Sequence, residues 1–185
     1  MVDHMKAVLR GQFEAALAMF NDCLVKCAPE EWDSAVAKYS FWQVAYHTLC
    51  FVDCYLSPGN DEFAKEVARR AVARTNDVSL PDLHPLGMKE LEDEYPSRRF
   101  TKDELFAYVT ICRQRIETVL GDGPESEGGD SLQGPSGFGW LPFSRAELHL
   151  YNIRHVQHHT GQLSAVLRRA GAGGGEPRWV KSGWK

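Results

Sequence analysis

The chain has 185 residues, a length that suits one domain, and we predict a single folded unit over residues 1–185. Hydrophobic residues make up 43% of it and charged residues 25%, which excludes a disordered chain. The formal net charge of -4 argues against a nucleic-acid partner, and without a long uncharged apolar run no membrane span is expected.

The first predicted helix runs from about Val2 to Cys27 and is followed by the helix breaker Pro29. Apolar residues recur along it every three or four positions, which indicates one buried face: Leu9, Phe13, Leu17, Phe20 and Leu24. A second helix is predicted from about Ser40 to Leu56, before Pro58. It is rich in aromatic residues and nearly free of charge, so we expect it to be mostly buried.

Residues 59–99 are less regular. A short amphipathic helix is predicted over Glu62–Arg74, with Phe63 and Val67 inward. A loop is then marked by Pro81, Pro85 and Gly87. A second short helix is predicted over Met88–Tyr95.

The third long helix is predicted to begin at a capping box, Thr101 with Glu104 three residues later. Its expected inward face comprises Leu105, Tyr108, Cys112, Ile116 and Val119. A Gly-, Ser- and Pro-rich loop over residues 121–139 leads to a second capping box, Ser144 with Glu147. The fourth long helix should then reach about Ala170, before a run of glycines.

Four long amphipathic helices predict an all-α protein, a four-helix bundle with extra short helices between its second and third long helices. No segment shows the alternation of a strand, so no sheet is expected. The connections between the second and third long helices, and between the third and fourth, are long. An up-down-up-down order of the helices is therefore allowed but not required. The C-terminal tail is predicted to dock on the bundle through Trp179 and Trp184.

Three histidines crowd into five residues of the fourth long helix, at positions 155, 158 and 159. Residues four apart lie on one helical face, so His155 and His159 point the same way and can converge on one ion. His158 is less well placed. The same face carries Leu148, Leu163 and Val166, so it belongs against the core, where unpaired polar groups are costly.

A third ligand is available at His47, on a buried face in the middle of the second helix. Facing histidines on two helices are an arrangement that bundles use to bind metals. Three neutral imidazoles with an open position typify a catalytic metal site. The alternative is that these are ordinary hydrogen-bonded core histidines. The other histidines, His4, His84 and His149, are not expected to be ligands.

Two segments resemble the DinB/YfiT-like superfamily. Residues 151–163, Tyr-Asn-Ile-Arg-His-Val-Gln-His-His-Thr-Gly-Gln-Leu, resemble its last-helix signature, and residues 42–47, Trp-Gln-Val-Ala-Tyr-His, resemble its second-helix segment. The resemblance covers nearly the whole chain and implies a bundle that binds nickel or zinc through His47, His155 and His159. It also implies that homodimers are common. Many members carry a further histidine where this chain has Tyr151.

The resemblance leaves the function open between two classes. Some relatives use low-molecular-weight thiols, so one expectation is a metal-dependent enzyme, such as a thiol-dependent S-transferase or a hydrolase, acting on a small molecule. Gln43 and Gln162 lie one turn from ligands and could orient them; the alternative is ordinary helix-packing hydrogen bonds. The other class is a non-catalytic, stress-associated bundle in which the divalent transition metal is structural. The fourth coordination position of the ion would be filled by water in an open catalytic site, or by the Cys50 thiolate in a closed structural one.

Five cysteines are present, an odd number, and residues 1–6 lack the order of a signal peptide. Free thiols in a reducing, cytoplasmic compartment are therefore expected. A third interpretation makes Cys23 and Cys27 redox sensors, because their spacing puts them at the far edge of disulfide reach.

Overall fold

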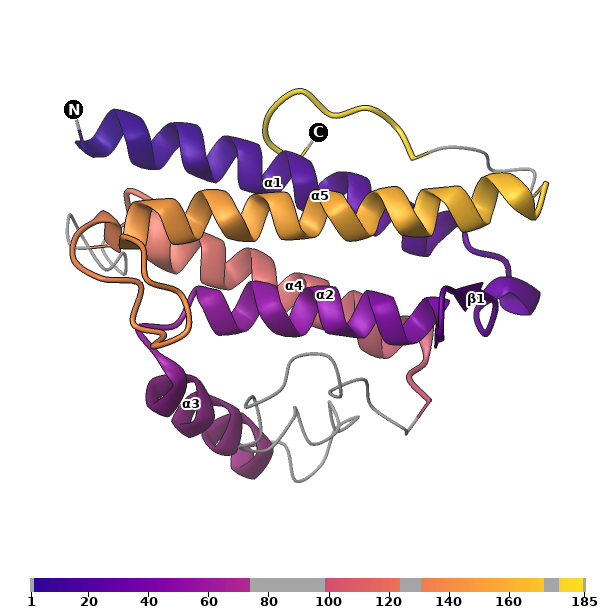
Figure 1. Ribbon diagram of the computed structural model, residues 1–185, viewed down its shortest axis with the longest axis horizontal. Helices are drawn as coiled ribbons and strands as arrows, with labels where there is room; N and C mark the ends of the chain where they lie inside the picture. The colour runs from indigo at the N-terminus through magenta and orange to yellow at the C-terminus, as the bar shows by residue number, and fades with distance from the viewer. Residues whose placement is uncertain (1, 74–98, 124–130, 172–176, 185) are drawn as a thin grey trace.

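The computed structural model describes residues 2–73, 99–123, 131–171 and 177–184, and the side chains of 67–73 are outside that description. Four long helices form a bundle, α1 (Val2–Lys26), α2 (Phe41–Tyr55), α4 (Lys102–Leu120) and α5 (Arg145–Arg169), with a shorter helix α3 (Asn60–Ala73) after α2 (Figure 1). The all-α architecture agrees with the prediction. Several predicted features lie outside the described residues: the loop at Pro81, Pro85 and Gly87, the helix over Met88–Tyr95, the side chain of Val67, and His84.

Capping boxes start three of these helices. Both predicted boxes are present: Thr101 and Ser144 each accept a hydrogen bond from the backbone three residues later, and Glu104 and Glu147 reach back to the cap. A third box, Ser40 with Gln43, starts α2. These side chains satisfy backbone N–H groups that have no partner inside the helix, so the helix starts are encoded locally.

The order of the bundle is up-down-down-up. Helix α1 packs against α4 and α5, and α2 packs against the same two helices. Cys23 near the end of α1 contacts Thr160 late in α5, so these helices are parallel. The Cys112 thiol reaches the Leu49 carbonyl, and Arg115 reaches that of Leu56, so α2 and α4 are also parallel. The long connection between α2 and α4 makes this order geometrically accessible.

The predicted apolar faces meet in one core. The residues expected to face inward on α1 and α4 are all buried: Leu9, Phe13, Leu17, Phe20, Leu24, Leu105, Tyr108, Cys112, Ile116 and Val119. Phe63 of α3 is buried with them. None of the described helices is both long and apolar enough to cross a membrane.

A buried ion pair ties α2 to α4 within this core. Asp53 is fully buried, and its carboxylate lies 3.6 Å from Nε of Arg115 and accepts a hydrogen bond from the Tyr108 hydroxyl at 3.3 Å. Arg115 also donates to the Leu56 carbonyl. The cluster compensates a carboxylate that would otherwise be costly to bury.

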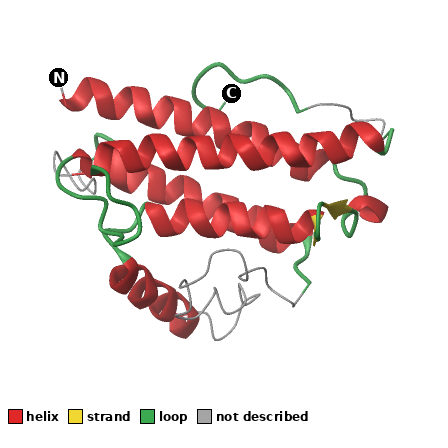
Figure 2. Cartoon of the chain, viewed as in Figure 1, coloured by secondary structure: helices red, strands yellow, loops and turns green. Residues whose placement is uncertain are grey.

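A small hairpin precedes α2, and the expectation of no strand was wrong there (Figure 2). Strand β1 (Ala35–Val36) pairs antiparallel with β2 (Tyr39–Ser40), with Ala35 opposite Ser40 and Val36 opposite Tyr39. Each strand has two residues, too short to display a period of two. Ala37, at the turn, has a φ of 55°, in the left-handed region.

The C-terminal tail docks on α1, but through one tryptophan rather than two. The Arg113 guanidinium stacks on the Trp184 ring at 3.9 Å, and Gly183 N–H donates to the Gly11 carbonyl. A Cβ atom on Gly11 would lie 2.7 Å from the Ser182 hydroxyl, so a glycine suits this contact. Trp179 is 79% exposed, which contradicts its predicted docking: it points to solvent between two anchored neighbours.

Candidate metal centre

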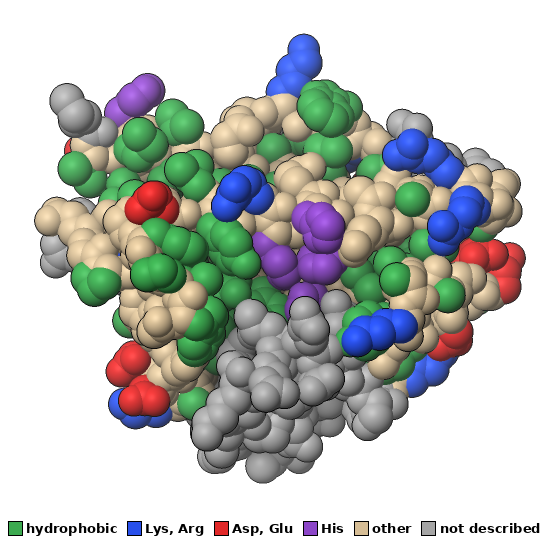
Figure 3. Space-filling model, in the orientation of Figure 1, with side chains coloured by type: hydrophobic (Ala, Val, Ile, Leu, Met, Phe, Trp, Pro, Cys, Tyr) green, Lys and Arg blue, Asp and Glu red, His purple; other side chains and the backbone are tan. Residues whose placement is uncertain are grey.

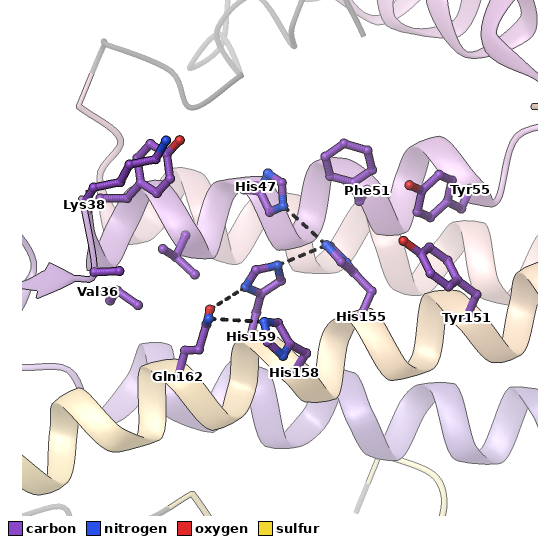
Figure 4. A pocket seen from close by; sticks show the side chains of 13 residues that line it. Val36, Lys38, His47, Phe51, Tyr55, Tyr151, His155, His158, His159 and Gln162 are labelled. Carbon is purple, nitrogen blue, oxygen red and sulfur yellow. Dashed lines mark hydrogen bonds between the residues drawn. The ribbon is translucent and has the colours of Figure 1, made fainter. Parts of the chain in front are cut away.

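The three predicted histidines lie together between α2 and α5. His47 projects from α2, and His155 and His159 project from successive turns of α5 (Figure 4). Nε2 of His155 lies 3.3 Å from Nε2 of His47 and 3.1 Å from Nε2 of His159. Because α2 and α5 cross side by side, residues more than a hundred positions apart meet at one point.

Gln162 determines which nitrogen of His159 is free. Its amide oxygen, which can only accept, lies 2.8 Å from Nδ1 of His159, so that nitrogen carries the proton. Nε2 of the neutral ring is then a bare lone pair directed at His155. The Gln162 amide nitrogen donates to Nε2 of His158 at 3.2 Å, so one side chain connects both rings.

Hydrogen bonds among the three rings cannot satisfy their nitrogens. Nε2 of His155 touches both of the other Nε2 atoms but carries at most one proton, and Nε2 of His159 carries none. A cation between the rings would satisfy all three lone pairs. Nitrogens about 2.1 Å from a tetrahedral ion lie about 3.4 Å apart, near the observed Nε2–Nε2 distances of 3.3 Å and 3.1 Å. The donor set therefore fits a divalent transition metal.

The surroundings keep these imidazoles neutral. Burial, together with the charge that His159 would carry, lowers the pKa of His47 to about 3. Burial also lowers the pKa of His159 to about 4, although its hydrogen bond to Gln162 opposes the shift. The pKa of His155 falls well below its ordinary value, first through burial and then through His159 and His47. Neutral imidazole is the form that binds metals, so the ligands are ready at neutral pH.

A cavity of about 660 Å³ leads to the histidines. Its lining mixes apolar and polar side chains from the hairpin, α2 and α5: Val36, Ala37, Lys38, Tyr39, Val44, His47, Phe51, Tyr55, Tyr151, His155, His158, His159 and Gln162. Figure 3 shows histidine side chains reaching the surface in the middle of this face, beside hydrophobic ones. The volume is that of a small-molecule site.

Aromatic side chains form one wall of this cavity. The centroid of the Phe51 ring lies 5.4 Å from that of the His155 ring. The centroid of the Tyr55 ring lies 5.2 Å from that of Phe51 and 5.7 Å from that of Tyr151. Burial raises the pKa of Tyr55 well above its ordinary value, and the neighbouring Tyr151 adds to the shift. Tyr55 therefore presents a neutral phenol on this wall, and Tyr151 lies next to it beside the histidines (Figure 4). The sequence pattern did not single out Tyr55.

Two residues considered as parts of the site lie elsewhere. Gln43 is not among the residues that line the cavity, and it accepts a hydrogen bond from the Ser40 backbone as part of the capping box of α2. Within the described residues, the group of potential ligand atoms that lie within 4.8 Å of one another holds the three histidines and no thiol. Cys50 is buried and is not among the residues that line the cavity.

The remaining histidines and thiols have structural surroundings. His149 is fully buried, and its Nε2–H donates to the Ser131 carbonyl at 2.9 Å, which fastens the preceding loop to α5. His158 lines the cavity rim but is outside the group of three. Cys23 and Cys27 are free, and burial raises their thiol pKa values to about 12 and about 11. Such thiols react slowly, so the redox-sensor interpretation gains no support.

Comparison with known proteins gives a result for the family alone. The family model of the DinB superfamily matches residues 12–163, a span that contains His47, His155, His159 and Gln162. No curated protein and no solved structure matches the chain.

Proposed function

The chain belongs to the DinB superfamily, and from that premise we propose that it is a metal-dependent enzyme acting on a small molecule. His47, His155 and His159 bind the divalent ion, nickel or zinc. The observation that carries the proposal is the convergence of three imidazole nitrogens, one with its tautomer held by Gln162, at the wall of a cavity of about 660 Å³.

An open coordination position supports catalysis over a purely structural ion. The described residues offer three ligands, and the cavity reaches them from the side away from the core. A structural zinc site usually closes with four protein ligands. A bound divalent ion supplies Lewis acidity and lowers the pKa of a thiol or water placed against it.

The reaction that we favour is transfer of a carbon group to a low-molecular-weight thiol, and hydrolysis is the related case with water. The sulfur–carbon bond forms, the bond from that carbon to its leaving group breaks, and the thiol proton passes to solvent. Phe51 and Tyr55 exclude water from one side of the cavity. The hydroxyl of Tyr151, on the half-buried end of the wall, is placed to donate a hydrogen bond to the substrate.

A non-catalytic role for the ion has its own support. The three ligands join α2 to α5, so an ion would fasten two antiparallel helices of the bundle. Binding to the folded state alone would then raise the free energy of unfolding without any turnover.

Metal analysis of protein purified without a nickel column tests the metal site. Wild type is expected to contain about one equivalent of nickel or zinc, and His155→Ala and His159→Ala are expected to lose it. His4→Ala is the matched control, because this exposed histidine of α1 is outside the group of three and does not line the cavity. Metal-free wild type, or full occupancy in both ligand variants, contradicts the metal site.

A turnover assay separates the two roles. Metal-loaded protein is mixed with a fluorogenic bimane halide and a panel of thiols, beside the metal-free protein and His155→Ala. Acceleration that requires the metal and the histidine supports the enzyme. A loaded protein that gains thermal stability but accelerates neither thiol transfer nor ester hydrolysis supports the structural ion.

A further inference from the structure

The hairpin before α2 forms one rim of the cavity. Val36, Ala37, Lys38 and Tyr39 all line it, opposite the side formed by Tyr55 and Tyr151 (Figure 4). The hairpin is held against α5, where Arg169 donates to the Ala35 carbonyl. The histidines therefore lie between the aromatic wall and the hairpin.

The turn of this hairpin adopts a backbone conformation that its sequence does not favour. Ala37 has a φ of 55°, whereas two-residue hairpin turns usually have glycine at such a position. A non-glycine residue there costs free energy, and strained positions of this kind tend to occur at functional sites. Here the conformation puts Lys38 on the cavity rim.

The charge of the described cavity lining contrasts with that of the chain. The whole chain has a formal net charge of -4, yet the described lining contains no Asp or Glu. Lys38 is the permanently charged side chain of that lining, and its ammonium lies 5.0 Å from the centre of the Tyr39 ring. This contact favours a position of the ammonium near the rim. The described lining thus carries a positive group at one end and an apolar wall at the other.

We propose that this cavity selects small organic anions, and that Lys38 is the specificity-determining residue that pairs with the carboxylate of the ligand. The apolar body of the ligand lies along Phe51 and Val44, and its reacting group faces the three histidines. This inference rests on the proposed function, because it names the substrate class of the same site. A volume of about 660 Å³ suits a molecule that spans the rim and the histidines together.

The test compares two thiols that differ in one charge. Cobalt(II), whose complexes with nitrogen ligands are coloured, is loaded into the protein, and the thiolate-to-cobalt absorption band is titrated with 3-mercaptopropionate and with 3-mercapto-1-propanol. Wild type is expected to bind the carboxylate about fivefold more tightly than the neutral thiol. Lys38→Met is expected to bring this ratio to about one, and Lys38→Glu to reverse it.

Lys181→Met is the matched control, because it removes the same charge from the exposed tail that packs on α1, outside the cavity. Its affinity ratio should equal that of wild type, and circular dichroism verifies that each variant is folded. Equal affinities for the two thiols in wild type, or an unchanged ratio in both Lys38 variants, overturn this inference while the metal site stands. Absence of any cobalt spectrum overturns the proposed function, and this inference with it.

Discussion

Replacement of Gln162 by methionine tests how the site prepares its ligands. Methionine keeps an unbranched side chain of similar length but removes both the acceptor and the donor of the amide. The 2.8 Å hydrogen bond to Nδ1 of His159 is lost, and the ring can then carry its proton on Nε2, where the metal should bind. We therefore expect weaker metal binding without a change of ligands.

The expected magnitude follows from the role of such partners. A group that holds a metal-binding histidine in its tautomer contributes about 10- to 100-fold to metal affinity. Gln162 is only half-buried, so water can replace part of its hydrogen bonding. The lower end applies, about a tenfold loss, which corresponds to about 1.4 kcal/mol.

The assay is competition for zinc between the protein and a coloured chelator at neutral pH. Gln157→Met is the matched control, because Gln157 is an exposed glutamine of the same helix that does not line the cavity. The control should bind zinc like wild type. If Gln162→Met also binds zinc within about twofold of wild type, the tautomer argument is wrong.

Three further outcomes are expected from the structure. The pKa values of His47 and His159 are lowered to about 3 and about 4, so the unfolded chain takes up protons first as pH falls. The metal-free protein should lose at least about 2 kcal/mol of unfolding free energy between about pH 7 and about pH 5, and a constant urea midpoint refutes this. Ala37→Gly should raise the unfolding free energy by about 0.5 kcal/mol, since glycine relieves the positive φ; a lower urea midpoint contradicts the strain. Asp53→Asn leaves the Arg115 cation without its buried counter-charge and should cost about 3 kcal/mol in urea unfolding, and a loss below about 1 kcal/mol argues against the ion pair.

The helices were predictable because their signals are local. The apolar period of α1 and α4 and the capping residues Thr101 and Ser144 act within a few residues of one another. The hairpin at Ala35–Ser40 was missed because its strands are too short to carry a pattern, and it forms between two helices that hold it in place. Trp179 was placed wrongly because apolar character alone does not say which of two nearby tryptophans finds a surface to cover.

The candidate metal centre also depends partly on local sequence and partly on tertiary packing. The sequence by itself determined that His155 and His159 share a face, because the helical period puts residues four apart one above the other. Only the tertiary structure decided that His47 meets them and that the Cys50 thiol is outside the ligand group. It also decided that Gln43 caps a helix while Gln162 holds His159. These relations depend on how α2 is rotated and shifted against α5, which non-local packing of the whole core controls.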